Sequence, residues 1–363
     1  MKRIALFFSI LCICLCIAAC DAADPENLFE MPDAPDTTAA NHTNNFTAAD
    51  EGNYQYGNMQ KNIPSGDFMR LGDEVLFTQA QGSGFLLYSY NLSTGEVRPY
   101  CRDATCDHRK CGTGTLLGNL EQYGGELYCL NVNNTIVKLE KAQMEPQLEG
   151  SVYDFWHYGG DLYVRTADAS LLIYEDGKKE PRTILEEYSR YWNVIFGQYL
   201  YGTAAGSLTR VDLLADEPVE EVLLENVNAT VEGEHIYYTP DDNFYLYRCN
   251  MDGTEPELIL DKPVLIKWGN FDEEYFYFRL YTNLELDGED SHDIYRFPKD
   301  DPTDIQLIAT LPESVGDIFT VPGTGKIFVE TRMIGGDGNR VPSPIYVMNS
   351  DGSNIKALEF PET

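Results

Sequence analysis

The chain has 363 residues, with 59 acidic and 26 basic side chains and a formal net charge of −33. A surface this negative repels nucleic acid and anionic lipid headgroups, which excludes both as partners. Cations, basic peptides and neutral glycans remain compatible with the charge, which also keeps a surface protein soluble. The sequence lacks GxSxG, HExxH, Walker and dinucleotide-binding motifs, so no common enzyme class is indicated.

The first 20 residues, MKRIALFFSILCICLCIAAC, have the layout of a secretory signal. A basic start precedes an apolar run over residues 4–17, which is too short for a comfortable transmembrane helix. The segment IAAC at residues 17–20 resembles a bacterial lipobox, in which the cysteine is lipidated after cleavage. We therefore expect residues 1–19 to be a lipoprotein signal peptide and Cys20 to anchor the protein outside the cytoplasm, on the bacterial cell membrane. A plain signal peptide with an incidental cysteine is the alternative.

Residues 21–62 are rich in Asp, Ala, Thr, Asn and Pro and show no sustained hydrophobic period. This composition is typical of a disordered tether. With lipidated Cys20 it makes up segment 20–62, whose coil dimension would be roughly 35 Å. We expect the tether to hold the folded body, residues 63–363, clear of the membrane.

A repeat runs through the remaining chain. An aliphatic or Phe residue followed by Tyr or Phe recurs seven times, in most cases shortly after a Gly, at spacings of 51, 35, 38, 36, 40 and 51 residues. The pairs are Leu76-Phe77, Leu127-Tyr128, Leu162-Tyr163, Leu200-Tyr201, Ile236-Tyr237, Phe276-Tyr277 and Ile327-Phe328. Each pair predicts one β-strand of a repeating unit.

Each unit contains three further apolar stretches. One short stretch precedes the pair, and a second follows it, as in LTRVDL and IYVMN. Several units then contain a glycine turn such as MDGT or SDGS before a last run such as PELIL. In ELYCLNV both alternating faces are apolar, which is expected when a sheet is pressed between two neighbours. We therefore predict an all-β fold: a seven-bladed β-propeller of four-stranded antiparallel blades.

The repeats IYVMNSDGSNIKAL and LYRCNMDGTEPELIL resemble those of TolB-like propellers. Over residues 68–360 the chain is similar to lipid-anchored propeller proteins of unknown function from Gram-positive bacteria. The α/β domain that precedes the propeller in TolB is not seen ahead of these repeats, so the resemblance implies the fold and does not imply TolB's role in the envelope.

Three connections are longer than the others. They follow the second strand of unit six, the second strand of unit seven and the last strand of unit one. In a meander these connections emerge on one face of the disc, and units six, seven and one are consecutive around a ring. Since long loops on a rigid scaffold commonly bind ligands, we predict a contact surface formed by residues 101–113, 279–293 and 331–343. Extended hairpins without a ligand are the alternative.

The unit-one connection begins with CRDATCDHRKC, which contains Cys101, Cys106, His108 and Cys111. These are ligand types that could complete a tetrahedral zinc shell. A disulfide among the three cysteines suits an exported protein equally well. The third alternative is a loop that neither binds zinc nor forms a disulfide. After cleavage of the signal peptide and lipidation of Cys20, five of the nine cysteines remain as thiols that could pair. An odd number cannot be fully paired within one chain.

The unit-six connection offers oxygen ligands for a cation at Asp287, Glu289, Asp290 and Asp293, although no EF-hand spacing is present. A solvated acidic tip is the simpler interpretation. Cys129 and Cys249 are expected to be buried strand residues. His157 and His235 precede or begin second strands and are expected to be surface or rim residues.

These observations predict a lipid-anchored extracytoplasmic module that binds a protein or glycan ligand as a monomer, and they favour binding over catalysis. The first alternative is a propeller glycosidase, lyase or other hydrolase, which needs two convergent carboxylates beside the central channel. The second is a structural component of the cell envelope. Fold alone does not decide between them.

Overall fold

The protein was analysed as a computed structural model. Internal contacts divide the chain into two units, Met1–Ala40 and Asn41–Thr363. The described residues all belong to the second unit. They are residues 68–81, 84–101, 116–131, 133–140, 143–148, 151–176, 178, 180–204, 206–264, 266, 269–280, 291–321, 323–332 and 344–361.

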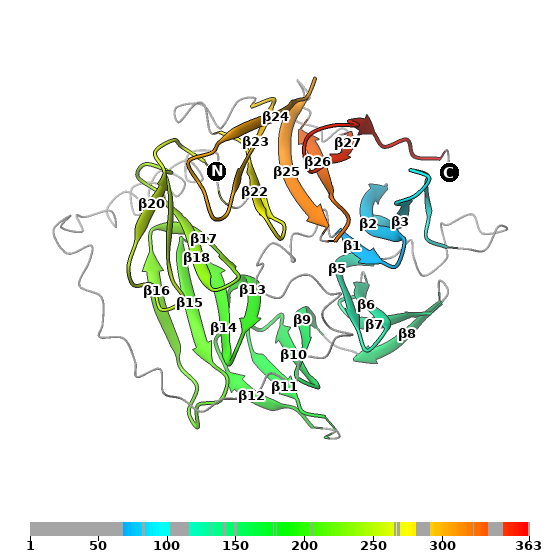
Figure 1. Cartoon of the computed structure of the whole chain (residues 1–363). Helices are drawn as coiled ribbons and strands as arrows, with labels where there is room; N and C mark the ends of the chain where they lie inside the picture. The colour runs from blue at the N-terminus through cyan, green and yellow to red at the C-terminus, as the bar shows by residue number, and fades with distance from the viewer. Residues whose placement is uncertain are drawn as a thin grey trace, which may run out of the picture. The chain divides into compact units, whose positions relative to one another are not determined.

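The described residues form a seven-bladed β-propeller, which confirms the predicted fold (Figure 1). Each blade is an antiparallel meander whose first strand is innermost and whose fourth is outermost. The first strands are β1 (Met69–Leu71), β5 (Leu116–Tyr123), β9 (Val152–Tyr158), β13 (Tyr191–Phe196), β17 (Val227–Glu232), β21 (Asn270–Phe271) and β25 (Ser314–Val321). The second strands are β2 (Glu74–Gln81), β6 (Glu126–Asn131), β10 (Asp161–Thr166), β14 (Tyr199–Ala204), β18 (His235–Pro240), β22 (Tyr275–Phe278) and β26 (Lys326–Arg332).

The outer two strands of each blade complete the meander. The third strands are β3 (Gly84–Asn91), β7 (Ile136–Glu140), β11 (Leu171–Tyr174), β15 (Ser207–Asp212), β19 (Leu246–Asn250), β23 (Asp293–Pro298) and β27 (Ile345–Asn349). The fourth strands are β4 (Val97–Pro99), β8 (Gln143–Leu148), β12 (Arg182–Leu185), β16 (Glu220–Glu225), β20 (Glu257–Leu260), β24 (Gln306–Thr310) and β28 (Lys356–Ala357). Blades 1 and 2 are additionally joined by one pair between β3 and β5.

Every recurring residue pair of the sequence lies in the second strand of its blade, as predicted. Alternate side chains of β6 show why both faces are apolar: Leu127 and Cys129 pack against blade 1, whereas Tyr128 and Leu130 pack against blade 3. One hydrophobic cluster of this kind occupies each of the seven interfaces between neighbouring blades. The core is therefore distributed around the ring, between sheets.

Blade 1 departs from the predicted repeat by one residue. In the other six blades the first residue of the pair faces the preceding blade and the second faces the following one. In blade 1 Leu76 faces blade 2, whereas Val75 and Phe77 face blade 7. The equivalent pair is therefore Val75-Leu76, because a shift of one residue in a strand exchanges its two faces. The interval from Gly72 to Val75 matches those from Gly197 to Leu200 and from Gly233 to Ile236.

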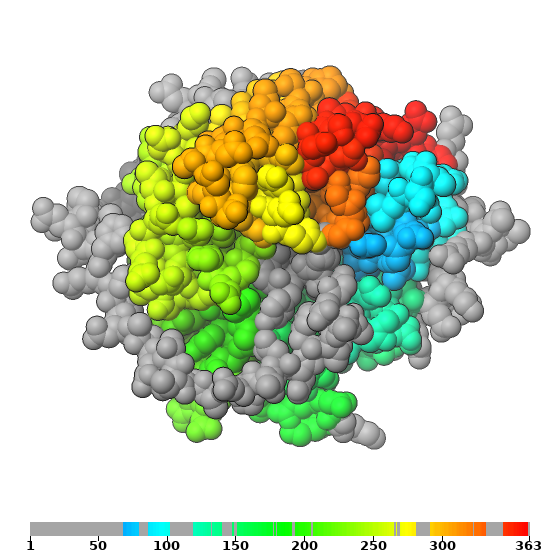
Figure 2. Space-filling model, viewed as in Figure 1, coloured from blue at the N-terminus to red at the C-terminus, as the bar shows by residue number. Residues whose placement is uncertain are grey.

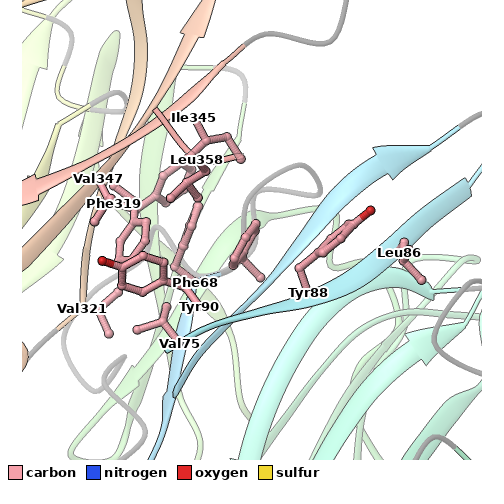
Figure 3. Packing of buried hydrophobic residues seen from close by; sticks show 12 residues of the cluster. Phe68, Val75, Leu86, Tyr88, Tyr90, Phe319, Val321, Ile345, Val347 and Leu358 are labelled. Atoms are coloured by element: carbon pink, nitrogen blue, oxygen red, sulfur yellow. The ribbon is translucent and has the colours of Figure 1, made fainter. Parts of the chain in front are cut away.

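Side-chain packing closes the ring between blades 7 and 1. Blade 1 consists of strands β1–β4 and blade 7 of strands β25–β28, so the described parts of the two blades exchange no strand. The Phe68 ring lies 5.0 Å from the Phe77 ring, 4.8 Å from the Phe319 ring and 4.7 Å from the Phe328 ring (Figure 3). Figure 2 shows blade 7 in orange and red directly against blade 1 in blue.

Turns between third and fourth strands lock one blade onto the next. Gly352 adopts a φ of +81°, which side chains rarely tolerate, and a Cβ at this position would lie 2.0 Å from the Ile308 carbonyl oxygen of blade 6. In the same turn Asp351 accepts hydrogen bonds from the Ser353 amide and hydroxyl groups. The Arg296 guanidinium of blade 6 donates to the Ser350 carbonyl, which adds a second link between the two blades.

Candidate ligand-binding face

Three long connections leave the ring from adjacent blades. The strand bounds leave 14 residues between β22 and β23, 12 between β26 and β27, and 16 between β4 and β5. The other connections at these strand ends hold at most nine residues, between β20 and β21. Because each blade is an antiparallel meander, the three connections start on one face of the ring, which we call the loop face. The anchoring strands thus have the arrangement expected from the sequence.

Most of the predicted site residues lie outside the described residues. This applies to Cys20, Cys106, His108, Cys111, Asp287, Glu289 and Asp290. Cys101 follows β4 and is buried. Within the described residues, no three His, Cys, Asp or Glu side chains are grouped so that they could hold a metal ion. The zinc, disulfide and cation-site hypotheses therefore stay predictions.

Asp293 lies at the start of β23 and forms hydrogen bonds within its own blade. Its carboxylate accepts a hydrogen bond from the Thr310 hydroxyl at 2.6 Å and one from the Tyr295 hydroxyl at 3.3 Å. Thr310 ends β24, so Asp293 ties together the third and fourth strands of blade 6. These contacts give Asp293 a structural role that its position in an acidic stretch does not reveal.

Two other predictions concern cysteine and histidine. Cys129 and Cys249 are buried strand residues, as expected, and burial raises the pKa of the Cys249 thiol to about 12. His157 precedes the second strand of its unit, as expected; it belongs to the innermost strand β9 and is partly buried. Its Nδ1 lies 2.7 Å from the Glu121 carboxylate of blade 2, and its ring stacks on Tyr123 at 4.5 Å. The dyad joins the innermost strands of blades 2 and 3.

A buried polar network near the loop face was not predicted. Asn119 of β5 donates to the Asp154 carboxylate of β9 at 2.8 Å, and Asp154 pairs across the strands with Arg165 of β10. The Tyr188 hydroxyl donates to the Asn193 side-chain oxygen at 2.6 Å, and burial raises the pKa of Tyr188 well above its usual value. These groups span blades 2, 3 and 4. The sequence signal is an Asn or Asp in the first strand of successive units.

Gly202 makes room for this network. A Cβ at position 202 would lie 2.4 Å from the Tyr188 hydroxyl and 2.5 Å from the Asn193 side-chain oxygen. The close approach of these two oxygen atoms therefore restricts position 202 in β14 to glycine. Its backbone carbonyl also accepts a hydrogen bond from the Thr209 hydroxyl at 3.2 Å.

A second unpredicted cluster lies at the opposite ends of the first strands in blades 5 and 6. The Lys299 ammonium lies 3.2 Å from the Glu232 carboxylate and donates to the Asp272 carbonyl at 2.6 Å. Glu232 and Lys299 retain only 18% and 25% side-chain exposure. Desolvation, helped by the charges of Asp272 and Glu273, raises the pKa of Glu232 to about 7 despite the Lys299 charge.

The third-strand arginines of blades 4, 5 and 6 each contact the fourth strand of their own blade. In each, an arginine on the third strand contacts an acid or amide on the fourth. The pairs are Arg210–Glu221, Arg248–Glu257 and Arg296–Gln306, with N–O distances of 2.6, 2.6 and 3.0 Å. Arg210 and Arg248 are thus paired with carboxylates of their own blades, whereas Arg296 contacts an uncharged amide.

The outer strands expose single aliphatic side chains, among them Val222, Leu258 and Leu307 on consecutive blades. Isolated exposed aliphatic residues are normal on soluble proteins. A search of the described residues finds no apolar helix of membrane-spanning length.

Comparison with known proteins supports the fold. No protein-family model and no curated protein matches the chain. Among solved structures, a puromycin-hydrolysing peptidase from Mycobacterium tuberculosis matches with a TM-score of 0.56 and 10% identity, over 83% of this chain and 53% of the peptidase. An oligogalacturonate lyase from Vibrio parahaemolyticus matches with a TM-score of 0.42 and 12% identity, over 81% of this chain and 86% of the lyase.

A putative TolB from Agrobacterium tumefaciens is also similar, with a TM-score of 0.38 and 13% identity over 55% of this chain and 77% of that protein. The chain spans 30% of tricorn protease and about half of the peptidase, the first two matched structures. At these identities the matches show a β-propeller repeat protein and nothing about its ligand.

Proposed function

We propose that this protein is a lipid-anchored extracytoplasmic binding module that engages its ligand on the loop face. The observation that carries the proposal is the placement of all three long connections on the adjacent blades 6, 7 and 1. Packing between blades holds the strands that anchor them, and rigid scaffolds with local long loops are typical of binding proteins. The lipobox-like segment at residues 17–20 supports the anchor on the bacterial cell membrane.

The anchor and the binding face are tested separately. Cys20→Ser is expected to move the protein from the membrane fraction to the medium, and unchanged membrane retention would contradict lipid anchoring. For binding, the full chain in detergent is titrated with calcium, an oligolysine peptide and neutral oligosaccharides, the three classes that the charge allows. Replacing residues 281–290 and 333–343 by two-residue turns should abolish binding. Shortening the turn at 213–219, on the opposite face, is the matched control.

Two results would refute the binding proposal. One is the absence of binding by all three probe classes at millimolar concentration. The other is equal binding by the wild type and the chain with shortened connections. In both cases the thermal transition of each variant establishes that the ring is folded.

A hydrolase or lyase is the second candidate, and Glu232 is the observation that favours it. A carboxyl group with a pKa of about 7 beside Lys299 has the properties of a general acid or base. Asp272 and Glu273 on the neighbouring blade bring further carboxylates to the same end of the ring. Release of reducing ends from neutral and acidic polysaccharides by the wild type, and its loss in Glu232→Gln, would establish this activity.

A further inference from the structure

The junction between blades 7 and 1 differs from the other six junctions of the ring. At each of those six, the chain itself passes from the fourth strand of one blade to the first strand of the next. Blades 7 and 1 are the last and the first of the series, so no such connection joins them. The described fourth strand of blade 7 is also short, since β28 has two residues and β16 of blade 4 has six. Non-covalent contacts therefore provide the closure that a peptide connection provides elsewhere.

The segment that follows β28, residues 358–361, starts on blade 7. The Leu358 amide donates a hydrogen bond to the Ile345 carbonyl oxygen at 2.7 Å, which continues the pairing of β28 with β27 by one residue. Leu358 is buried and belongs to the hydrophobic cluster between blades 7 and 1 (Figure 3). Glu359 is exposed, and Phe360 is partly buried against the same cluster. The segment therefore turns alternate side chains into the junction, as a strand does.

Phe360 carries the segment onto blade 1, and Figure 1 shows the red chain after β27 running towards β3. The Phe360 ring lies 5.0 Å from the Tyr88 ring and 6.2 Å from the Phe77 ring, with interplanar angles of 77° and 70°. Tyr88 and Phe77 pair across β3 and β2, and their rings stack at 6.0 Å. Edge-to-face ring pairs stabilise a contact beyond the area that they bury. Residues 358–361 thus make contacts with both blades.

The contacts of this segment lie where two long connections meet the ring. Ile345 is the first residue of β27, at which the long connection from β26 returns to the sheet. Tyr88 pairs with Pro99, the last residue of β4, and the long connection to β5 begins after Pro99. The segment therefore bridges the bases of two of the three long connections.

We propose that residues 358–361 form a strap that holds blade 7 against blade 1 and keeps the bases of these two connections together. The strap is attached by a backbone hydrogen bond and two inward side chains, and Phe360 is only partly buried. Small contacts of this kind open at a lower free energy than a core strand, so the junction loosens before the rest of the ring unfolds. This device goes beyond the proposed binding function, and its test needs no ligand.

The test is hydrogen exchange of the full chain in detergent, measured by mass spectrometry on peptides from every blade. Phe360→Ala removes the ring that contacts blade 1. Glu359→Ala is the matched control, because it changes the exposed side chain between the two inward ones. Tyr88→Leu removes the aromatic partner on β3 but keeps apolar bulk, and a double variant combines Tyr88→Leu with Phe360→Ala.

In Phe360→Ala we expect the amides of β2, β3 and β27 to exchange roughly tenfold faster than in the wild type. The amides of blades 3 and 4 in this variant, and all amides in Glu359→Ala, should stay within about twofold of the wild type. Because the two rings act as a pair, the acceleration in the double variant should be smaller than the product of the two single accelerations. Unchanged exchange at the junction, equal acceleration in all blades, or multiplicative effects in the double variant would each overturn the strap.

Discussion

Glu232 makes a measurable contribution to the pH dependence of stability. Its pKa is about 7 in the folded protein against a usual value of 4.5. The folded state therefore holds a proton that the unfolded state has released between these two pH values. Stability from this group is present in full below pH 4.5 and is lost as pH rises to about 7. At 1.36 kcal/mol for each pKa unit, the loss is about 3 kcal/mol.

Glu232→Gln removes this titration. We expect the free energy of unfolding of the variant, minus that of the wild type, to increase by about 3 kcal/mol between pH 4 and pH 8. Urea unfolding followed by circular dichroism at several pH values gives this difference directly. Taking the difference removes the contribution of all other titrating groups.

Glu234→Gln is the matched control, because Glu234 is an exposed carboxylate in the turn that follows Glu232. The pH dependence of Glu232→Gln is judged against the pH dependence of this variant, measured in the same way. A constant difference for Glu232→Gln would show that the carboxylate is solvated in the folded protein, and one that decreases with rising pH would show that the Lys299 charge outweighs desolvation. Either result would refute the reasoning.

Two further predictions concern the ring seam and the cysteines. Phe328→Ala should lower the free energy of unfolding by roughly 3–5 kcal/mol, because Phe328 is fully buried between blades 7 and 1. A decrease below about 1 kcal/mol in urea unfolding would contradict closure of the ring by this packing. Leu307→Ala serves as the control for an exposed residue. For Cys101, Cys106 and Cys111, the intact mass of the unreduced mature protein is measured together with its metal content. A mass lower by two hydrogens without zinc would exclude the metal hypothesis, and bound zinc without mass loss would exclude the disulfide.

The repeat in the sequence predicted the fold because it reports a local requirement. Both faces of each blade are pressed against neighbours, so each second strand carries apolar residues at successive positions, and most of the turns that precede these strands carry glycine. The lengths of the connections likewise predicted which blades carry the long excursions. The error in blade 1 arose because Leu76-Phe77 satisfies the pattern as well as Val75-Leu76. Only packing against blades 7 and 2 distinguishes the two registers.

Contacts between blades could not be predicted from the sequence. Asn119, Asp154 and Arg165 lie on three strands of two blades, and Glu232 approaches Lys299 across 67 positions of the chain. Composition marks such residues as ordinary surface charges, and nothing local distinguishes them. Packing of neighbouring blades brings them together and removes water from around them, and that desolvation raises the pKa of Glu232. The sequence alone thus determined the repeating architecture, whereas the chemistry of the candidate sites was decided by which blades become neighbours.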